Sequence, residues 1–197
     1  MYTLIIDSAT KVLYHALVKD DKVVAEAYTN GQNDHAKNIV SIVEKFLKDE
    51  NITTDNLDKI VCGIGPGSYT GVRMAVTVSK MLGAFKHIPV YEISTLALIS
   101  SGMEGKCLSM IDARRGNAFA GIYQDGNLIG KEAIINKEEF LKNSHDSVAT
   151  ESEFKVNPFV VINKAILHEN PHSLKPNYLQ ETEAERNLEA NENKKNA

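Results

Sequence analysis

The sequence predicts an α/β fold made of two related lobes, of which the second is shorter than the first. Residues 4–7 (LIID) align on residues 109–112 (SMID), so an apolar strand that ends in aspartate occurs twice. Two further strands joined by a short turn follow each copy, and a helix follows each pair. Three antiparallel strands that continue into alternating helices and strands describe a ribonuclease-H-like lobe. Its duplication gives the actin, sugar-kinase and Hsp70 type of fold.

The first lobe is predicted to be complete. Alternating apolar residues place strands at 12–18 and 23–28, on either side of a short polar turn. Apolar runs bounded by glycine and proline then predict an alternation of helices and strands. The predicted elements of this series are the helix 34–49, the strand 59–64, the helix 70–86, the strand 88–93 and the helix 94–101.

The second lobe is predicted to be cut short. Strands at 118–123 and 128–134 flank an Asp-Gly pair, which is a strong hairpin signal. Only a helix at 137–143, a weak strand at 147–149 and a helix at 158–168 follow them. The expected division is a first lobe over 1–102, a reduced second lobe over 103–180 and a polar, disordered tail over 181–197, which has almost no large apolar residue.

Composition and charge exclude several classes of protein. The 197 residues carry a formal net charge of −4, so the chain lacks the basic field with which a protein binds bare nucleic acid unaided. Its two cysteines, Cys62 and Cys107, lie in apolar stretches and are expected to be reduced and buried. No uncharged apolar stretch is long enough to span a membrane, and Asp7 comes too early for a signal peptide. A cytoplasmic protein is expected.

Residues 65–73 (GPGSYTGVR) join a buried strand to a long helix through three glycines and a proline. Free N–H groups at a helix N-terminus favour an anion, although the loop lacks the lysine of a P-loop. The alternative is a tight turn that needs glycine for its dihedral angles. A serine nucleophile is disfavoured because no base is placed nearby, and a helix cap is the better interpretation. The weak anion-site candidates in this loop are Gly67, Ser68, Tyr69, Thr70 and Gly71.

Several segments together resemble the TsaB (YeaZ) family, the dimerisation subunit of the bacterial machinery that makes threonylcarbamoyladenosine next to the tRNA anticodon. They occur in order between residues 4 and 180. The glycine loop and the run Asp-Ala-Arg-Arg-Gly are the specific ones. The matching segments are residues 5–8 (IIDS), 65–73 (GPGSYTGVR), 93–96 (ISTL), 111–116 (IDARRG) and 176–179 (PNYL).

The resemblance implies a non-catalytic subunit that pairs with TsaD, the transferase, and activates it. TsaD carries a metal on a His-x-x-x-His pair, and the equivalent positions here are Thr95 and Ile99. Isoleucine cannot bind a metal and a lone threonine is a poor ligand for iron or zinc. The resemblance therefore implies no catalytic residue, no metal and no cofactor of its own, although a nucleotide can sit at the joint with partner subunits. It also implies contact with TsaE through the complex, contact with tRNA only through the partner, no membrane partner, and a homodimer when the chain is alone.

A stand-alone small-molecule kinase of the actin class is the alternative function. Asp7 and Asp112 end the two repeated strands, where such kinases hold magnesium and phosphate. The first phosphate loop of those enzymes needs glycine, and residues 11–14 (KVLY) contain none. Arg114 and Arg115 after the second aspartate are weak anion-site candidates, since arginine grips phosphate or carboxylate bidentately; pairing with Asp112 or another acid is the alternative.

Residues 168–172 (HENPH) match the zinc-protease pattern H-E-x-x-H, which needs both histidines on one face of a continuous helix. Pro171 breaks such a helix, so no zinc site is predicted.

Two helices carry more apolar surface than one core contact requires, which predicts a partner interface. On the helix 70–86, small residues at four-residue spacing would let a second helix approach closely, and the large apolar face of Met74, Val78, Met81 and Phe85 is the alternative. The predicted interface residues are Ile39, Val43, Phe46, Arg73, Ala75, Ser79 and Gly83.

Overall fold

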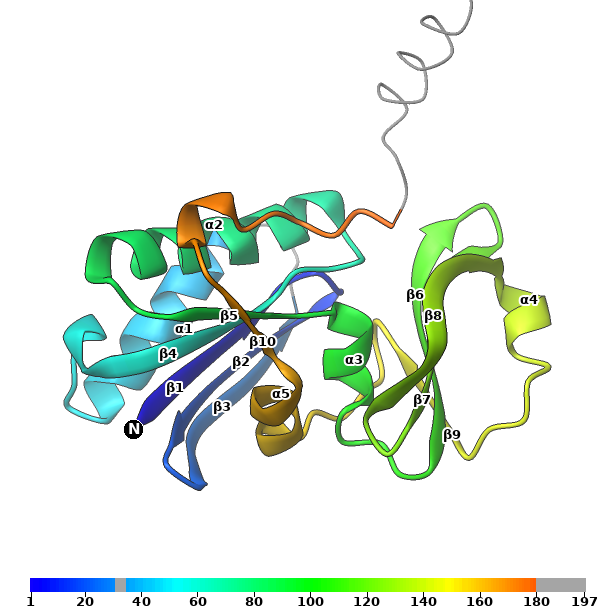
Figure 1. The fold of residues 1–197 in the computed structure, drawn as a ribbon, viewed down its shortest axis with the longest axis horizontal. Helices are drawn as coiled ribbons and strands as arrows, with labels where there is room; N and C mark the ends of the chain where they lie inside the picture. Colours follow the sequence, from blue (N-terminus) through cyan, green and yellow to red (C-terminus); the bar gives the residue numbers. More distant parts are fainter. Residues whose placement is uncertain (31–34, 180–197) are drawn as a thin grey trace, which may run out of the picture.

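The computed structural model describes residues 1–30 and 35–179, with side chains in the first helix described from Ile39 onward. Two β-sheets lie side by side, and helices cover the larger sheet on both faces (Figure 1). The predicted tail over 181–197 lies outside the described residues.

The first sheet has six strands in the order β10-β5-β4-β1-β2-β3. Its first three strands pair antiparallel, and β4 and β5 then continue parallel to β1. This is the predicted ribonuclease-H-like arrangement. Its elements are β1 (Tyr2–Asp7), β2 (Val12–Lys19), β3 (Lys22–Asn30), α1 (His35–Asp49), η1 (Thr54–Asn56), β4 (Leu57–Gly63), α2 (Tyr69–Lys86), β5 (Val90–Ile93) and α3 (Thr95–Ser100).

The second sheet repeats the pattern with four strands in the order β8-β7-β6-β9. Three antiparallel strands are again followed by a strand parallel to the first of them. The duplicated fold with a shortened second lobe is thereby confirmed. The Asp-Gly turn is also confirmed, since Asp125 and Gly126 have φ values of 50° and 76°. The elements are β6 (Lys106–Arg114), β7 (Asn117–Gln124), β8 (Asn127–Asn136), α4 (Lys137–Phe140) and β9 (Ser147–Thr150).

The helix predicted over 158–168 is wrong in its second half. Helix α5 (Pro158–Lys164) ends at Ala165, which is extended, and the chain continues as β10 (Ile166–His168), antiparallel to β5. The open edge of β5 supplies the backbone partners that convert an apolar helix end into a strand. The lobe division at residue 102 stays a prediction, but β10 returns to the first sheet, and η2 (Pro171–Ser173) then packs against α2.

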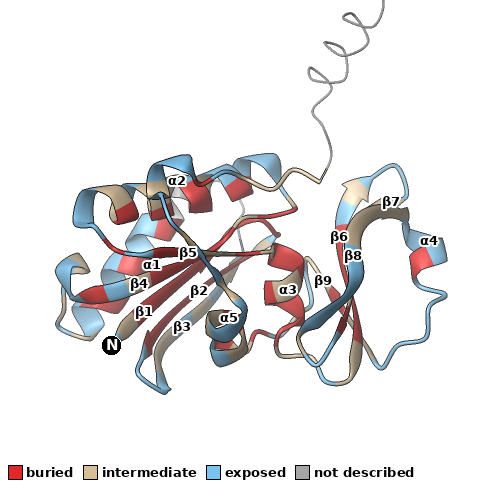
Figure 2. Ribbon diagram, viewed as in Figure 1, coloured by how far each residue is buried: buried red, intermediate tan, exposed pale blue. Residues whose placement is uncertain are grey.

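Three apolar clusters form the core, and buried residues line both faces of the first sheet (Figure 2). One cluster lies between this sheet and helices α1 and α2. A second joins the opposite face to α3, α5 and the second sheet, which fixes the two lobes against each other. Within the described residues, no helix is long and apolar enough to cross a membrane.

Candidate functional site

The glycine loop joins the start of α2 to the residues that follow β1 through hydrogen bonds. This contact is here called the β1–α2 seam. The Ser68 N–H donates to the Ala9 carbonyl at 2.7 Å, and the Ser8 hydroxyl donates to the Gly71 carbonyl at 2.7 Å. The Ser68 side chain accepts from the Gly71 N–H and caps α2, as the helix-cap interpretation predicts. Two N–H groups that an anion would need, those of Ser68 and Gly71, are therefore already bound within the chain. Anion binding at Gly67, Tyr69 and Thr70 stays a prediction.

Asp7 is buried beneath the β1–α2 seam. Its side chain is 1% exposed, and it accepts hydrogen bonds from the Thr95 hydroxyl at 2.6 Å and the Ala9 N–H at 2.9 Å. A Cβ added at Gly63 would lie 1.8 Å from its Oδ2 atom, so the strand beside it leaves no spare room. Burial raises the pKa of Asp7 to about 6, and the two hydrogen bonds lower it. A carboxyl closed in this way has no open side for a metal ion or a phosphate.

Thr95 and Ile99 lie where the resemblance places the transferase metal ligands. Thr95 is buried and links Asp7 to the glycine loop, since its Oγ1 also accepts from the Gly65 N–H at 3.0 Å. Ile99 is fully buried in the cluster between the lobes. Across residues 1–30 and 35–179, no three His, Cys, Asp or Glu side chains gather as a metal site requires.

The sealed carboxyl predicts a pH-dependent effect of Asp7→Asn. The pKa of Asp7 is raised from about 3.8 to about 6 in the folded chain, so the Asp7 carboxyl stays protonated up to a higher pH in the folded chain than in the unfolded chain. The wild type therefore loses stability relative to the variant as the pH rises from 4 to 7, by roughly 2–3 kcal/mol in total. Urea unfolding of both proteins at pH 4, 5, 6 and 7 measures this difference.

The stability of the wild type has to be compared with that of Asp7→Asn at each pH because His15 also titrates in this range. Burial lowers the pKa of His15 to about 4, and within the described part of the chain neither ring nitrogen has a hydrogen-bond partner. This histidine destabilises both proteins as the pH falls from 6.5 towards 4, which opposes the Asp7 effect in the wild type and cancels in the difference between the two proteins. A constant difference across the range would show that folding does not raise the pKa of Asp7.

Arg114 and Arg115 lie on the exposed turn between β6 and β7. With Gly116 they form three consecutive residues of positive φ, at 67°, 53° and 77°. The Asp112 carboxylate accepts from the Arg114 N–H at 3.3 Å, so it braces the turn through the backbone. Among the described residues, neither guanidinium forms an ion pair. Their role as an anion site stays a prediction.

The predicted interface on α1 and α2 is wrong for six of its residues, because they face the protein's own core. Ile39, Val43 and Phe46 pack in the cluster between the helices and the sheet. Ala75, Ser79 and Gly83 are buried as well, and a Cβ added at Gly83 would lie 2.4 Å from Val90. The small residues let α2 approach its own sheet closely, which the sequence alone did not distinguish from approach to a partner. These six residues are Ile39, Val43, Phe46, Ala75, Ser79 and Gly83.

Arg73, the seventh predicted interface residue, is exposed and belongs to a different face of α2, here called the α2 outer face: Tyr69, Arg73, Thr77, Met81 and Phe85. Met81 is 55% exposed and Phe85 is 78% exposed. At the helix start, Tyr69 stacks on Tyr178 with ring centroids 5.3 Å apart, and Arg73 donates to the Tyr69 hydroxyl at 2.6 Å. Met81 and Phe85 belong to the alternative face predicted from the sequence, but the other two residues of that face, Met74 and Val78, are half-buried and pack against the core. The four-residue spacing from Tyr69 to Phe85 is the signal that could have found the rest of the α2 outer face.

Two smaller predictions concern cysteine and zinc. Both cysteines are free and buried, and burial raises the pKa of Cys62 to about 12, so its thiol stays protonated.

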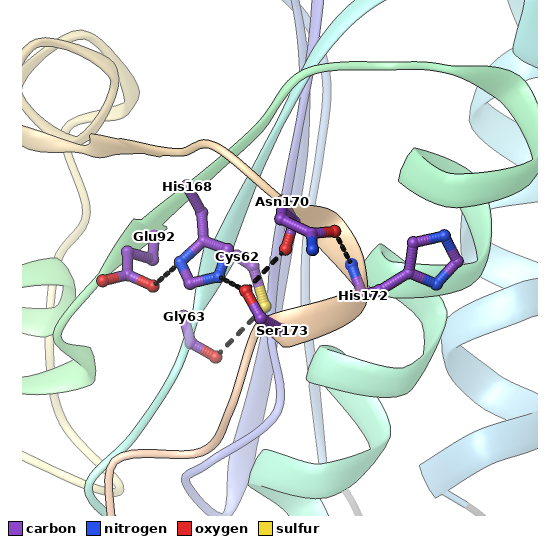
Figure 3. A network of polar contacts seen from close by, with 7 residues as sticks. All are labelled: Cys62, Gly63, Glu92, His168, Asn170, His172 and Ser173. Atoms are coloured by element: carbon purple, nitrogen blue, oxygen red, sulfur yellow. Dashed lines mark hydrogen bonds and ion pairs between the residues drawn. The ribbon is translucent and has the colours of Figure 1, made fainter.

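In the H-E-x-x-H segment, His168 lies on β10 and His172 in η2, and their rings point in different directions (Figure 3). The segment forms no continuous helix, as predicted from Pro171.

Comparisons with known proteins match this chain to the TsaD family model and to TsaB proteins. The family model described as "TsaD: tRNA N6-adenosine threonylcarbamoyltransferase" matches residues 22–187. The tRNA threonylcarbamoyladenosine biosynthesis protein TsaB of Bacillus subtilis is 33% identical over 72% of this chain, and TsaB of Escherichia coli is 30% identical over 63%. The matched stretches span only 63% and 55% of those two relatives. The structure of YeaZ from Pseudomonas aeruginosa superposes with a TM-score of 0.76 at 20% identity, over 90% of this chain and 99% of that one. This last likeness concerns the fold.

Proposed function

Because this chain belongs to the TsaB family, within the wider family of the TsaD model, we propose that it serves threonylcarbamoyladenosine biosynthesis on tRNA as a non-catalytic subunit. In this proposal it pairs with TsaD and activates it for modification of the adenosine next to the anticodon. The partner holds tRNA and the threonylcarbamoyl donor. The proposal extends to a cytoplasmic location, to contact with TsaE through the complex, and to a homodimer when TsaD is absent.

The observation that carries the proposal is the contrast between Asp7 and the α2 outer face. The carboxyl that a catalytic relative would use is buried under Gly63 and bonded to Thr95. In contrast, α2 presents large apolar side chains to solvent, and exposed aromatic, methionine and arginine residues are enriched at protein interfaces. This chain is therefore equipped to bind a protein and poorly equipped to bind a metal-bound phosphate.

The test is reconstitution with purified components. The chain and TsaD are mixed with tRNA, ATP and the threonylcarbamoyl-adenylate donor, and modified adenosine is measured by mass spectrometry. We expect modification only when both proteins are present, co-elution of the two proteins, and no ATP hydrolysis by the chain alone. Steady ATP turnover by the chain alone, lost in Asp7→Asn, would establish the kinase alternative instead.

A further inference from the structure

A serine, a histidine and a glutamate form a chain of hydrogen bonds at the edge of the first sheet. His168 Nδ1 lies 2.8 Å from Glu92 Oε2, and His168 Nε2 lies 2.9 Å from Ser173 Oγ (Figure 3). Such an arrangement, in which a histidine is bonded to a hydroxyl on one side and a carboxylate on the other, is the geometry that activates a serine nucleophile. No step of the proposed function uses it.

The fold holds each member of this triad in place. Val90 pairs with His168 across the two strands, so Glu92 is the diagonal neighbour of His168 on the same face of the sheet. Ser173 ends the short helix η2, which Asn170 caps and which packs against α2. The next residue, Leu174, is 1% exposed and anchors this segment in the core. Ser173 itself is exposed, so a substrate can reach its hydroxyl.

The hydrogen-bond donors and acceptors of the triad are arranged as in a serine nucleophile before it reacts. With the Nδ1 proton donated to Glu92, Nε2 is an acceptor that faces the Ser173 hydroxyl. The hydroxyl oxygen also lies 2.9 Å from the Asn170 carbonyl, so its single proton has two acceptors. A small rotation of the hydroxyl directs the proton to the histidine.

The surroundings of Ser173 limit its rate. An oxyanion hole needs free N–H donors beside the nucleophile. Here the N–H groups of His172, Ser173 and Leu174 donate to Asn170 Oδ1, Asn170 O and Pro171 O. Because the neighbouring donors are bound, acylation should be slower by roughly 10²–10³-fold than in an enzyme that has such a hole.

We propose that Ser173, His168 and Glu92 form a site, independent of the proposed function, at which Ser173 accepts an acyl group from an activated ester. Ser173 Oγ attacks the carbonyl carbon, and its proton passes to His168 Nε2. The ester C–O bond breaks, and the departing oxygen takes that proton. Water then attacks the acyl carbon after giving a proton to Nε2, and Ser173 leaves with this proton restored.

A fluorophosphonate probe tests the proposal on the full chain, since serine attack on phosphorus displaces fluoride and leaves a stable adduct. Mass spectrometry should find the adduct on Ser173 and not on Ser152, a matched exposed serine outside the triad. Ser173→Ala should abolish the adduct, and Ser152→Ala should leave it unchanged. Hydrolysis of p-nitrophenyl acetate should be slow and follow the same order among the variants.

The Glu92→Gln variant distinguishes activation of Ser173 from a hydrogen bond that only holds β10 in place. Glutamine still accepts a hydrogen bond from His168 Nδ1, so β10 stays attached, but the negative charge that supports a histidinium is gone. Labelling of Ser173 should fall at least about tenfold while the melting temperature stays close to that of the wild type. Equal labelling in the wild type and Glu92→Gln, or labelling of Ser173 no faster than that of Ser152, would overturn the proposal.

Two cysteine variants, Ser173→Cys and Ser152→Cys, keep the test decisive if Glu92→Gln fails to fold. The native cysteines are buried, so Ser173→Cys and Ser152→Cys can each be followed by iodoacetamide at pH 7. A neighbouring histidine base should make Cys at position 173 react at least about tenfold faster than Cys at position 152. Equal rates would also overturn the proposal.

Discussion

A chain in which Met81 and Phe85 are both changed to aspartate is expected to bind TsaD at least about 100-fold more weakly than the wild type. These side chains are the most exposed large apolar groups of α2. If they fill pockets on the partner, two carboxylates would have to be desolvated there without compensation. Titration calorimetry of TsaD with each protein measures the loss, and tRNA modification should fall in parallel.

The double variant Phe159→Asp, Ile166→Asp is the matched control. Both residues are also exposed and apolar, at 38% and 70%, but they lie on α5 and β10 rather than on α2. We expect this control to bind TsaD as the wild type does. Both double variants should keep their melting temperatures, because exposed positions tolerate charge. Wild-type affinity in the α2 variant would exclude the α2 outer face as the interface.

The duplicated ribonuclease-H-like fold could be predicted from the sequence, because local signals agreed with the global fold. The repeated aspartate strand marks the start of each lobe, and the Asp-Gly turn and the glycine loop each fix a local geometry that agrees with this fold. The short strand β10 was missed because residues 166–168 are extended only through their pairing with the distant β5. Nothing within that segment distinguishes it from a helix end.

The site was harder to predict than the fold. The role of Ser68 as a cap follows from its position before a helix, and that prediction is confirmed. The burial of Ser79 could not be predicted, because a stripe of small residues has the same pattern whether it meets a sheet or a partner helix. The link from Glu92 through His168 to Ser173 joins residues far apart in the sequence, so only the folded sheet reveals it.

Gly71→Ala is expected to destabilise the fold by about 3 kcal/mol or more, although helix propensity alone predicts the opposite sign. Gly71 lies in the first turn of α2, where alanine would normally gain about 1 kcal/mol over glycine. A Cβ added there would lie 1.9 Å from the Ser8 carbonyl oxygen, a backbone atom that cannot move without breaking the Ser8 hydroxyl bond to Gly71. Overpacking against backbone should outweigh the gain from propensity.

Gly83→Ala in the same helix supplies the comparison. The nearest atom there is a side-chain methyl group of Val90, and the nearest backbone atom is the Ile88 carbonyl oxygen at 3.2 Å rather than 1.9 Å, so the loss of stability should be smaller. Urea unfolding gives the free energies, and for a chain of this size 3 kcal/mol corresponds to a fall of roughly 6–12 °C in the melting temperature. Gly71→Ala as stable as the wild type would show that the seam between β1 and α2 is loose. Because this seam sets where α2 starts, a tight seam also fixes the orientation in which Met81 and Phe85 are presented to a partner.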